Sequence, residues 1–427
     1  MGLLIKNATI VNHDKIWDKS QDILCENGKI IKIAPSIDVK GHEIVDAKGK
    51  KVLPGLIDIH VHLRQPGRED KETIETGSKS AVKGGFTTIM CMPNTTPVID
   101  NPMTVEYIIR EAHRVGLCNV YPIGALTKGQ KDEELTDMAE LKEAGCIAFS
   151  DDGKSVLNSR LFRLAMEYAK MVDVLIMEHC QDTLLTAGGV MNEGAVSTRI
   201  GLKGDPGIAE TVTVARDIEI AHYLDARVHL CHVSLKRCCE LIKAAKAQGI
   251  KVTAEACPHH FALTDETCAG FDTSTKVNPP LRSQEDVDAI KKYIADGTID
   301  CIVTDHAPHT KEDKEVGFDG APFGLIGLET SLGLTIKELV KPGIIDLPQM
   351  VDRMSYAPAR IVGLKSKGSI KEGYDADITI IDEHKEWTVT EEGFVSKSKN
   401  SPFIGWKLRG QVECTICNGK IVYKPGP

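Results

Sequence analysis

The stretch RVHLCHVSLKRCCELIKAAKAQGIKVTAEACPHH, residues 227–260, contains one complete strand–helix–strand repeat. An apolar run at 227–233 is followed by an amphipathic helical pattern at 234–249 and a second apolar run at 251–260. Two parallel strands can pair only after a crossover connection, which is usually a helix. The stretch therefore predicts an α/β architecture with parallel strands.

The same alternation extends from about residue 54 to residue 368. Apolar runs that we expect to form strands occur eight times, at 55–60, 86–94, 119–126, 145–152, 173–179, 227–233, 251–260 and 301–306. Helical patterns separate them, as at 102–116, 159–171 and 206–224. Eight such repeats predict a (β/α)8 TIM barrel. An open doubly wound sheet is the alternative, but it more often carries a Gly-rich dinucleotide loop after its first strand, which this sequence lacks.

The two ends of the chain differ from its middle. Residues 1–53 and 369–427 contain short strand patterns with turn signals at Asn27-Gly28 and Asn418-Gly419. Asn-Gly between two apolar runs is typical of a β-hairpin. We therefore expect one small β-sandwich domain, built from both termini, beside a barrel domain at 54–368.

Bulk properties exclude several classes of protein. The net charge is −9 over 427 residues, and no Lys/Arg-rich block is present, which argues against nucleic-acid binding. No apolar run approaches the ~20 residues needed to cross a bilayer. Thirteen cysteines without a secretion signal favour a cytoplasmic protein. Cys414 and Cys417 have the spacing of a redox pair, but they lie in a strand-like segment with no helix start after it, so we expect them to be structural.

Polar side chains follow most of the predicted strands. A barrel brings the carboxyl ends of all its strands to one mouth, where catalytic groups converge. His60 and His62 are two residues apart on a strand and should point to the same side. Alone, this pair is ambiguous, but the strand ends together supply His60, His62, Asn94, Asp151, Asp152, His179, His232 and Asp305. Four histidines with two carboxylates suit two zinc ions that share a bridging carboxylate.

Long motifs along the chain resemble the type I dihydroorotases. This family is similar to the hydantoinases and allantoinases, which belong to the same amidohydrolase superfamily. They are PGLIDIHVHLRQPG, FTTIMCMPNTTP, AFSDDG, EACPHHF, KVNPPLR, VTDHAPH and APFGLIGLET. The resemblance implies reversible, zinc-dependent cyclisation of N-carbamoyl-L-aspartate to (S)-dihydroorotate and water, a step of pyrimidine (UMP) biosynthesis. It also implies a homodimer and allows aspartate transcarbamoylase as a partner.

The resemblance also implies roles for individual residues. One metal is expected on His60, His62 and Asp305 and a second on His179 and His232. Asp152 is expected to bridge them, with Asp151 as the alternative. Asp305 is the expected proton shuttle. The expected substrate contacts are His62, Arg64, Asn94, Asn278, His309, Phe323 and Gly324. Arginine suits this task because its planar guanidinium grips a carboxylate with two hydrogen bonds.

Three points stay open at this stage. Gln65 stands where the family commonly has glutamate, which could alter loop contacts. His259-His260 looks metal-like, but we expect a structural role because the ligand set is already complete. The alternative functions are another cyclic amidohydrolase, such as a hydantoinase or allantoinase, and a non-catalytic scaffold for a partner enzyme.

Overall fold

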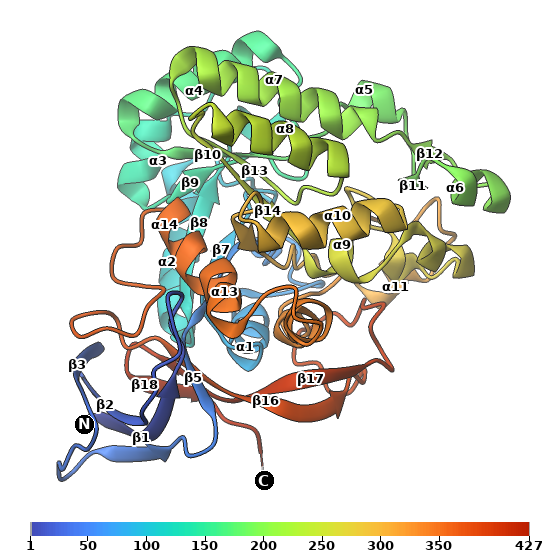
Figure 1. Ribbon diagram of the computed structural model, residues 1–427. Helices are drawn as coiled ribbons and strands as arrows, with labels where there is room; N and C mark the ends of the chain where they lie inside the picture. Colours follow the sequence, from blue (N-terminus) through green and yellow to red (C-terminus); the bar gives the residue numbers. More distant parts are fainter. Residues whose placement is uncertain (1, 427) are drawn as a thin grey trace.

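The central feature of the computed structural model, which describes residues 2–426, is a barrel of eight parallel strands (Figure 1). Each predicted apolar run contains one of them. They are β6 (Leu56–Val61), β7 (Phe86–Cys91), β8 (Asn119–Gly124), β9 (Ala148–Phe149), β10 (Leu175–Glu178), β13 (Val228–Leu230), β14 (Val252–Ala256) and β15 (Cys301–Ile302). Neighbours in the chain are neighbours in the barrel.

The barrel closes between its last and first strands. The chain beyond β15 pairs with β6 through a parallel bridge between Val61 and His306. The amide of His62 adds a 2.8 Å hydrogen bond to the carbonyl of His306. This closure confirms the predicted barrel and brings the ends of β6 and β15 side by side.

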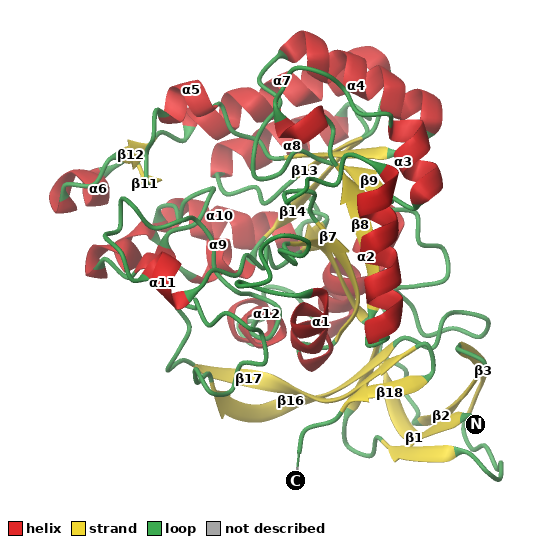
Figure 2. Ribbon diagram, turned by 180° about the vertical axis from the view of Figure 1, so that it is seen from behind, coloured by secondary structure: helices red, strands yellow, loops and turns green. Residues whose placement is uncertain are grey.

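Helices cover the outside of the barrel (Figure 2). The longer ones are α1 (Ile74–Lys83), α2 (Pro102–Val115), α3 (Met138–Ala144), α4 (Ser159–Val172), α7 (Ile208–Leu224), α8 (Lys236–Ala247) and α10 (Gln284–Ala295). Shorter ones are α5 (Thr183–Thr186), α6 (Ala195–Ile200), α9 (Pro258–Ala262), α11 (Lys311–Lys314), α12 (Ser331–Thr335), α13 (Leu347–Val351) and α14 (Ala357–Ile361). Among residues 2–426, no helix is long and apolar enough to cross a membrane.

Local sequence explains how these helices form. In α4, the Asn158 side chain accepts hydrogen bonds from the first turn and caps the helix. Phe162, Ala165, Met166 and Ala169 recur at helical spacing and are buried against the barrel. The opposite side of the helix faces solvent, so an apolar stripe three to four residues apart decides which face packs.

Both ends of the chain build one mixed sheet below the barrel (Figure 1). Its strands are β1 (Leu3–Ile10), β2 (Gln21–Glu26), β3 (Lys29–Ala34), β4 (Glu43–Asp46), β5 (Lys51–Pro54), β16 (Ile378–Thr388), β17 (Lys407–Cys417) and β18 (Lys420–Tyr423). β5 joins the two halves, because it pairs with β1 on one side and β16 on the other. The exact domain boundaries at 53/54 and 368/369 stay a prediction.

The two predicted hairpin turns are present in this sheet. Asn27 and Asn418 have φ values of 51° and 50°, and the glycines after them also have positive φ. Two successive residues with positive φ are what a tight turn between twisted antiparallel strands requires.

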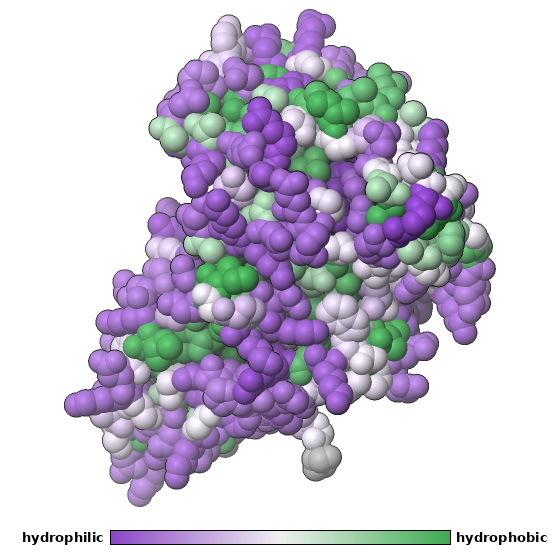
Figure 3. Space-filling view, turned by 45° about the vertical axis from the view of Figure 1, so that its right-hand side comes forward, coloured by the Kyte–Doolittle hydropathy of each residue, from purple (hydrophilic) through white to green (hydrophobic). Residues whose placement is uncertain are grey.

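Cys414 and Cys417 lie on β17, and all thirteen cysteines are free and buried. On the face that Figure 3 shows, apolar groups are separated by hydrophilic ones.

We predict that Phe162→Ala lowers the free energy of unfolding by about 3–5 kcal/mol, because it empties a fully buried site on α4. Met171→Ala on the same helix is the matched control, since this side chain is 82% exposed, and it should change stability by less than about 0.5 kcal/mol. Denaturant unfolding of both variants measures the difference. Equal losses of stability would contradict the assignment of the buried face.

Candidate active site

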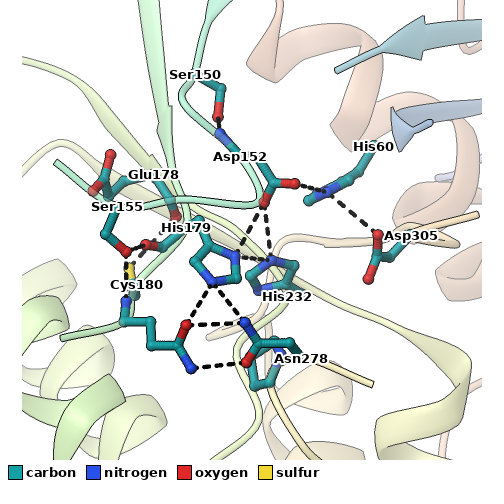
Figure 4. Close-up of polar contacts among 12 residues, drawn as sticks. His60, Ser150, Asp152, Ser155, Glu178, His179, Cys180, His232, Asn278 and Asp305 are labelled. Carbon is teal, nitrogen blue, oxygen red and sulfur yellow. Dashed lines mark hydrogen bonds and ion pairs between the residues drawn. The ribbon is translucent and has the colours of Figure 1, made fainter. Parts of the chain in front are cut away.

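The six predicted metal ligands come together at the mouth of the barrel. Figure 4 labels His60, Asp152, His179, His232 and Asp305 of this set. The six ligands come from the ends of β6, β9, β10, β13 and β15, and all six are buried. Their donor atoms form two clusters, in each of which the atoms lie within 4.8 Å of one another: His60, His62 and Asp305, and Asp152, His179 and His232. Residues up to 245 positions apart in the chain thus share one site.

Asp152 lies between the two clusters. Its Oδ2 atom is 3.4 Å from Nε2 of both His60 and His62. Its Oδ1 atom is 3.2 Å from Nδ1 of His179 and from Nε2 of His232. One carboxylate oxygen therefore faces each cluster, which is the geometry of a bridging ligand.

The neighbouring Asp151 has a different environment. Its Oδ1 accepts hydrogen bonds from the amides of Leu126 and Thr127, at 2.8 and 3.1 Å, and its Oδ2 accepts one from the Thr127 hydroxyl. Burial raises the pKa of Asp151 to about 6, although these hydrogen bonds act to lower it. Both of its oxygens face the loop after β8, so the geometry favours Asp152 as the bridge.

The donor atoms fit divalent metal ions. Ligand nitrogens about 2.0–2.1 Å from a tetrahedral zinc ion are about 3.3 Å apart. The distances from His60 and His62 Nε2 to Asp305 Oδ1 are 3.6 and 3.1 Å, close to this value. His60 Nε2 is also buried without a hydrogen-bond partner among residues 2–426. Buried polar atoms normally have a hydrogen-bond partner, so a buried ring nitrogen without one is free to coordinate a metal ion.

Other side chains fix the orientation of these imidazoles. Glu255 Oε1 accepts a 2.6 Å hydrogen bond from His60 Nδ1, and its Oε2 accepts one of 2.9 Å from His229 Nε2. Burial works to raise the pKa of Glu255, but His60 and His229 outweigh it and lower the pKa to about 2. Because Nδ1 is the donor, the lone pair of His60 Nε2 points to the site. Sequence reasoning missed Glu255, although a charged residue inside an apolar strand run was a usable signal.

The predicted substrate contacts line one cavity of about 290 Å³ beside the ligands. They are His62, Arg64, Asn94, Asn278, His309, Phe323 and Gly324. The cavity also borders Asp152, His179, His232 and Asp305. The structure therefore places every predicted contact at the same opening, next to both clusters.

Arg64, Asn94 and His309 form one side of this cavity. Arg64 Nε donates to the carbonyl of Pro308 at 3.1 Å, and its Nη2 is 3.3 Å from His309 Nε2. Burial lowers the pKa of Arg64 to about 10, so the guanidinium is still charged at neutral pH. Asn94 Oδ1 accepts from His62 Nδ1 at 2.9 Å, which leaves its amide group as a donor.

His309 is held as a neutral ring. Burial, together with the positive charges of Arg64, Lys71 and Lys314, holds the pKa of His309 far below its ordinary value. Lys71 Nζ donates to its Nδ1 at 2.9 Å, so Nε2 carries the hydrogen and donates to the carbonyl of Phe323 at 2.8 Å. Lys71 is a second residue that the sequence alone did not indicate.

Asn278 and Gly324 lie on the remaining sides. Asn278 pairs with Gln181 through two 2.9 Å hydrogen bonds, and its Nδ2 is 3.2 Å from His179 Nε2. Gly324 has φ 126°, and a Cβ atom there would lie 2.6 Å from the Ala307 Cβ, so the position requires glycine. Gln181 was also missed, because nothing in its local sequence distinguishes it.

The two open sequence features lie beside the site. Gln65 donates to the Tyr107 hydroxyl at 2.7 Å and accepts from the amide of Ile74 at 2.8 Å, so it holds the start of α1. His260 Nε2 donates to the carbonyl of Pro279 at 3.0 Å and so holds the loop that carries Asn278. His259 is buried, and burial lowers its pKa to about 4. The His260 contact agrees with a structural role for that residue, and the role of His259 stays a prediction.

Known proteins resemble the chain over its full length. The family model described as dihydro-orotase-like matches residues 49–238, and one described as amidohydrolase family matches residues 338–423. Dihydroorotase from Pelotomaculum thermopropionicum is 51% identical over 99% of this chain and 98% of its own. Dihydroorotase from Trichlorobacter lovleyi is 48% identical over 99% of both chains. The chain belongs to the dihydroorotase family.

Solved structures agree with this dihydroorotase-family fold. The L-hydantoinase (dihydropyrimidinase) from Arthrobacter aurescens superposes with a TM-score of 0.90 at 26% identity, over 100% of this chain and 97% of that one. The expected class is therefore confirmed: the protein is a metal-dependent cyclic amidohydrolase that acts on a small molecule. The curated dihydroorotases are much more similar in sequence than this hydantoinase is.

We predict that Glu255→Gln lowers the affinity for zinc by about 10- to 100-fold, because the carboxylate no longer orients His60. Zinc affinity is measured by competition with a chromogenic chelator. Glu210→Gln is the matched control, since Glu210 is equally buried but bonds Ser234 and Arg282 and should leave affinity unchanged. An unchanged affinity in Glu255→Gln would contradict the orienting role.

Proposed function

We propose that the protein is a dihydroorotase that interconverts N-carbamoyl-L-aspartate and (S)-dihydroorotate, with two zinc ions, in de novo pyrimidine synthesis. The observation that carries this proposal is one carboxylate, Asp152, facing two ligand clusters at the edge of a cavity that also contains Arg64. The similarity to curated dihydroorotases over the full chain supports the choice of substrate.

The proposed metal ligands follow from the two clusters. His60, His62 and Asp305 would hold one ion, His179 and His232 the other, and Asp152 both. When bound, such ions polarise a carbonyl oxygen and lower the pKa of water towards neutrality. Zinc is proposed because imidazole nitrogens and carboxylate oxygens are its common ligands.

The cavity offers a site for the carboxylate of dihydroorotate. The Arg64 guanidinium supplies charge and two parallel donors, and the free amide of Asn94 supplies another. Neutral His309 adds no charge of its own, so its contribution is to fix position through Arg64 and Phe323. The backbone at Phe323 and Gly324, together with the Asn278 side chain, would border the ring. A substrate held at several points is oriented before it reacts, which contributes to the rate.

Asp305 is the proposed proton carrier. Without a metal ion, burial works to raise its pKa, but the hydrogen bond from His62 and the charges of His60 and His62 outweigh it and hold the pKa well below the ordinary value. The carboxylate is then ionised at neutral pH, which a proton acceptor requires. In ring opening it would take a proton from the attacking water and pass it to the departing ring nitrogen, and in ring closure it would act in the opposite sense.

The alternative is a cyclic amidohydrolase of different specificity, such as a hydantoinase. The superposition with the Arthrobacter aurescens L-hydantoinase is the observation that favours it. The scaffold alternative has less support, because all six predicted ligands are present and converge.

For partners, we propose a homodimer on the resemblance alone, with aspartate transcarbamoylase as a second partner that the resemblance allows. Thirteen free, buried cysteines support a cytoplasmic location.

We predict that Asp305→Ala folds and keeps part of its metal but loses dihydroorotate turnover by a factor on the order of 10²–10⁴, since the proton carrier is gone. Turnover is measured together with metal content on one preparation. Asp300→Asn is the matched control, because Asp300 lies just before the same strand and pairs with Lys246 at 2.6 Å, away from the site. An Asp305→Ala enzyme with normal turnover would exclude the proposed role.

We predict that Arg64→Ala raises the KM for dihydroorotate at least about tenfold, because a buried charged donor to the carboxylate is lost. Arg68→Ala is the control, since Arg68 is exposed and pairs with Asp70. Steady-state kinetics on dihydroorotate and on hydantoin distinguish the two functions. A hydantoinase would turn over hydantoin with little dependence on Arg64, and that result would replace the proposed function.

A further inference from the structure

The connection between β16 and β17 reaches from the mixed sheet to the mouth of the barrel. We call residues 394–401 of this connection the strap. Its side chains alternate: Phe394, Ser396, Ser398 and Asn400 are buried, whereas Val395 and Lys397 are exposed. Such alternation is typical of extended chain with one side against the protein. The inward side chains of the strap meet the loops that carry the proposed substrate contacts.

Buried polar groups hold the strap against the barrel. The Ser396 hydroxyl and the Lys397 amide donate to the fully buried Glu72, at 2.5 and 3.1 Å. The Ser398 hydroxyl donates to the carbonyl of Lys71 at 2.7 Å. Lys71 in turn donates to His309. The strap is therefore fixed to the same loop that supplies Lys71 to the site.

Asn400 makes the closest connection to the cavity. Its Nδ2 donates to the carbonyls of Ala307 and Gly324, both at 3.1 Å. Its Oδ1 accepts a hydrogen bond of 3.1 Å from the amide of His309. The side chain is only 7% exposed, so water cannot readily replace these bonds. One amide group thus joins the loop after β15 to the loop that ends at Gly324.

These bonds act on three proposed substrate contacts. Asn400 holds the residues on both sides of Pro308, and the Pro308 carbonyl accepts from Arg64 Nε. It fixes His309 through its backbone amide and Gly324 through its carbonyl. Among residues 2–426, its side-chain hydrogen bonds go to none of the six proposed metal ligands.

We propose that Asn400 is a positioning residue for the substrate carboxylate, supplied to the barrel site by the mixed sheet at the chain termini. The proposal rests on the proposed function, because it takes Arg64 and His309 as the carboxylate side of the site and Gly324 as a border of the ring. It assigns the strap a role in substrate affinity that is separate from metal binding.

The test compares Asn400→Ala and Asn400→Asp with the unmodified protein, all loaded with zinc. Asn400→Asp keeps an acceptor for the His309 amide but loses both donated bonds, and it serves if Asn400→Ala does not fold. Ser401→Ala is the matched control, since Ser401 is equally buried but accepts only from the amide of Phe403 in its own segment. The measurements are zinc content, KM and kcat for dihydroorotate, the Kd of orotate, and amide hydrogen exchange at 307–309.

We expect both Asn400 variants to raise KM and the orotate Kd on the order of tenfold, because buried partners lose their hydrogen bonds. We expect kcat to change by less than about threefold and zinc content to stay the same, since the reacting groups are not touched. Exchange of the His309 amide should be faster in Asn400→Ala, and Ser401→Ala should match the unmodified protein throughout.

Two different failures can be told apart. An active unmodified protein together with Asn400 variants of unchanged KM and orotate Kd overturns the positioning role and leaves the proposed function intact. A zinc-loaded unmodified protein without dihydroorotate turnover contradicts the proposed function instead. In that case amide hydrogen exchange at His309 still tests the positioning role of Asn400. Unchanged exchange in Asn400→Ala overturns this role, and faster exchange supports it.

Discussion

The placement of the Asp152 carboxylate among four imidazoles is the constraint on which the rest of the site depends. Asp152 is 2% exposed, and a buried carboxylate is costly unless opposite charge or hydrogen-bond donors surround it. Without a metal ion, burial works to raise its pKa, but the charge of His60 and the hydrogen bonds from His179 and His232 outweigh it and hold the pKa well below the ordinary value. These imidazoles come from three separate strands, so only a closed barrel can bring them together.

The orientation of each ring matters as much as its position. An imidazole has two nitrogens, and a ligand must present the one that carries a lone pair. Glu255 determines which nitrogen His60 presents, and Asn94 does the same for His62. On the second cluster, Gln181 Oε1 lies 3.3 Å from Nε2 of His179 and can accept its hydrogen, which leaves the Nδ1 lone pair facing the cluster. One set of residues therefore supplies the metal-ligand atoms, and a second set orients the imidazole rings so that the nitrogen with the lone pair faces the site.

The mixed sheet at the chain termini is more than a support for the barrel. Its long strands β16 and β17 are joined by a connection that returns to the barrel mouth and carries Asn400. The buried charge of Glu72 fixes this connection, since the carboxylate accepts from the strap and lies 3.3 Å from His306 Nε2. Loops that bind small molecules need a rigid frame, and here both structural units supply it.

Apolar runs and turn signals in the sequence predicted the eight barrel strands, the two Asn-Gly hairpins and the polar residues at the strand ends. These features are local, because apolar periodicity, turn chemistry and the position after a strand can be read within about 10–20 residues. The resemblance already placed the bridge on Asp152, with Asp151 as the alternative, but only the tertiary structure shows that Asp152 faces the imidazoles while Asp151 faces the loop after β8. The tertiary structure also revealed Glu255 and Asn400, whose partners lie 195 and 93 residues away in the chain. Their hydrogen bonds exist only once the barrel is closed and the two termini have met.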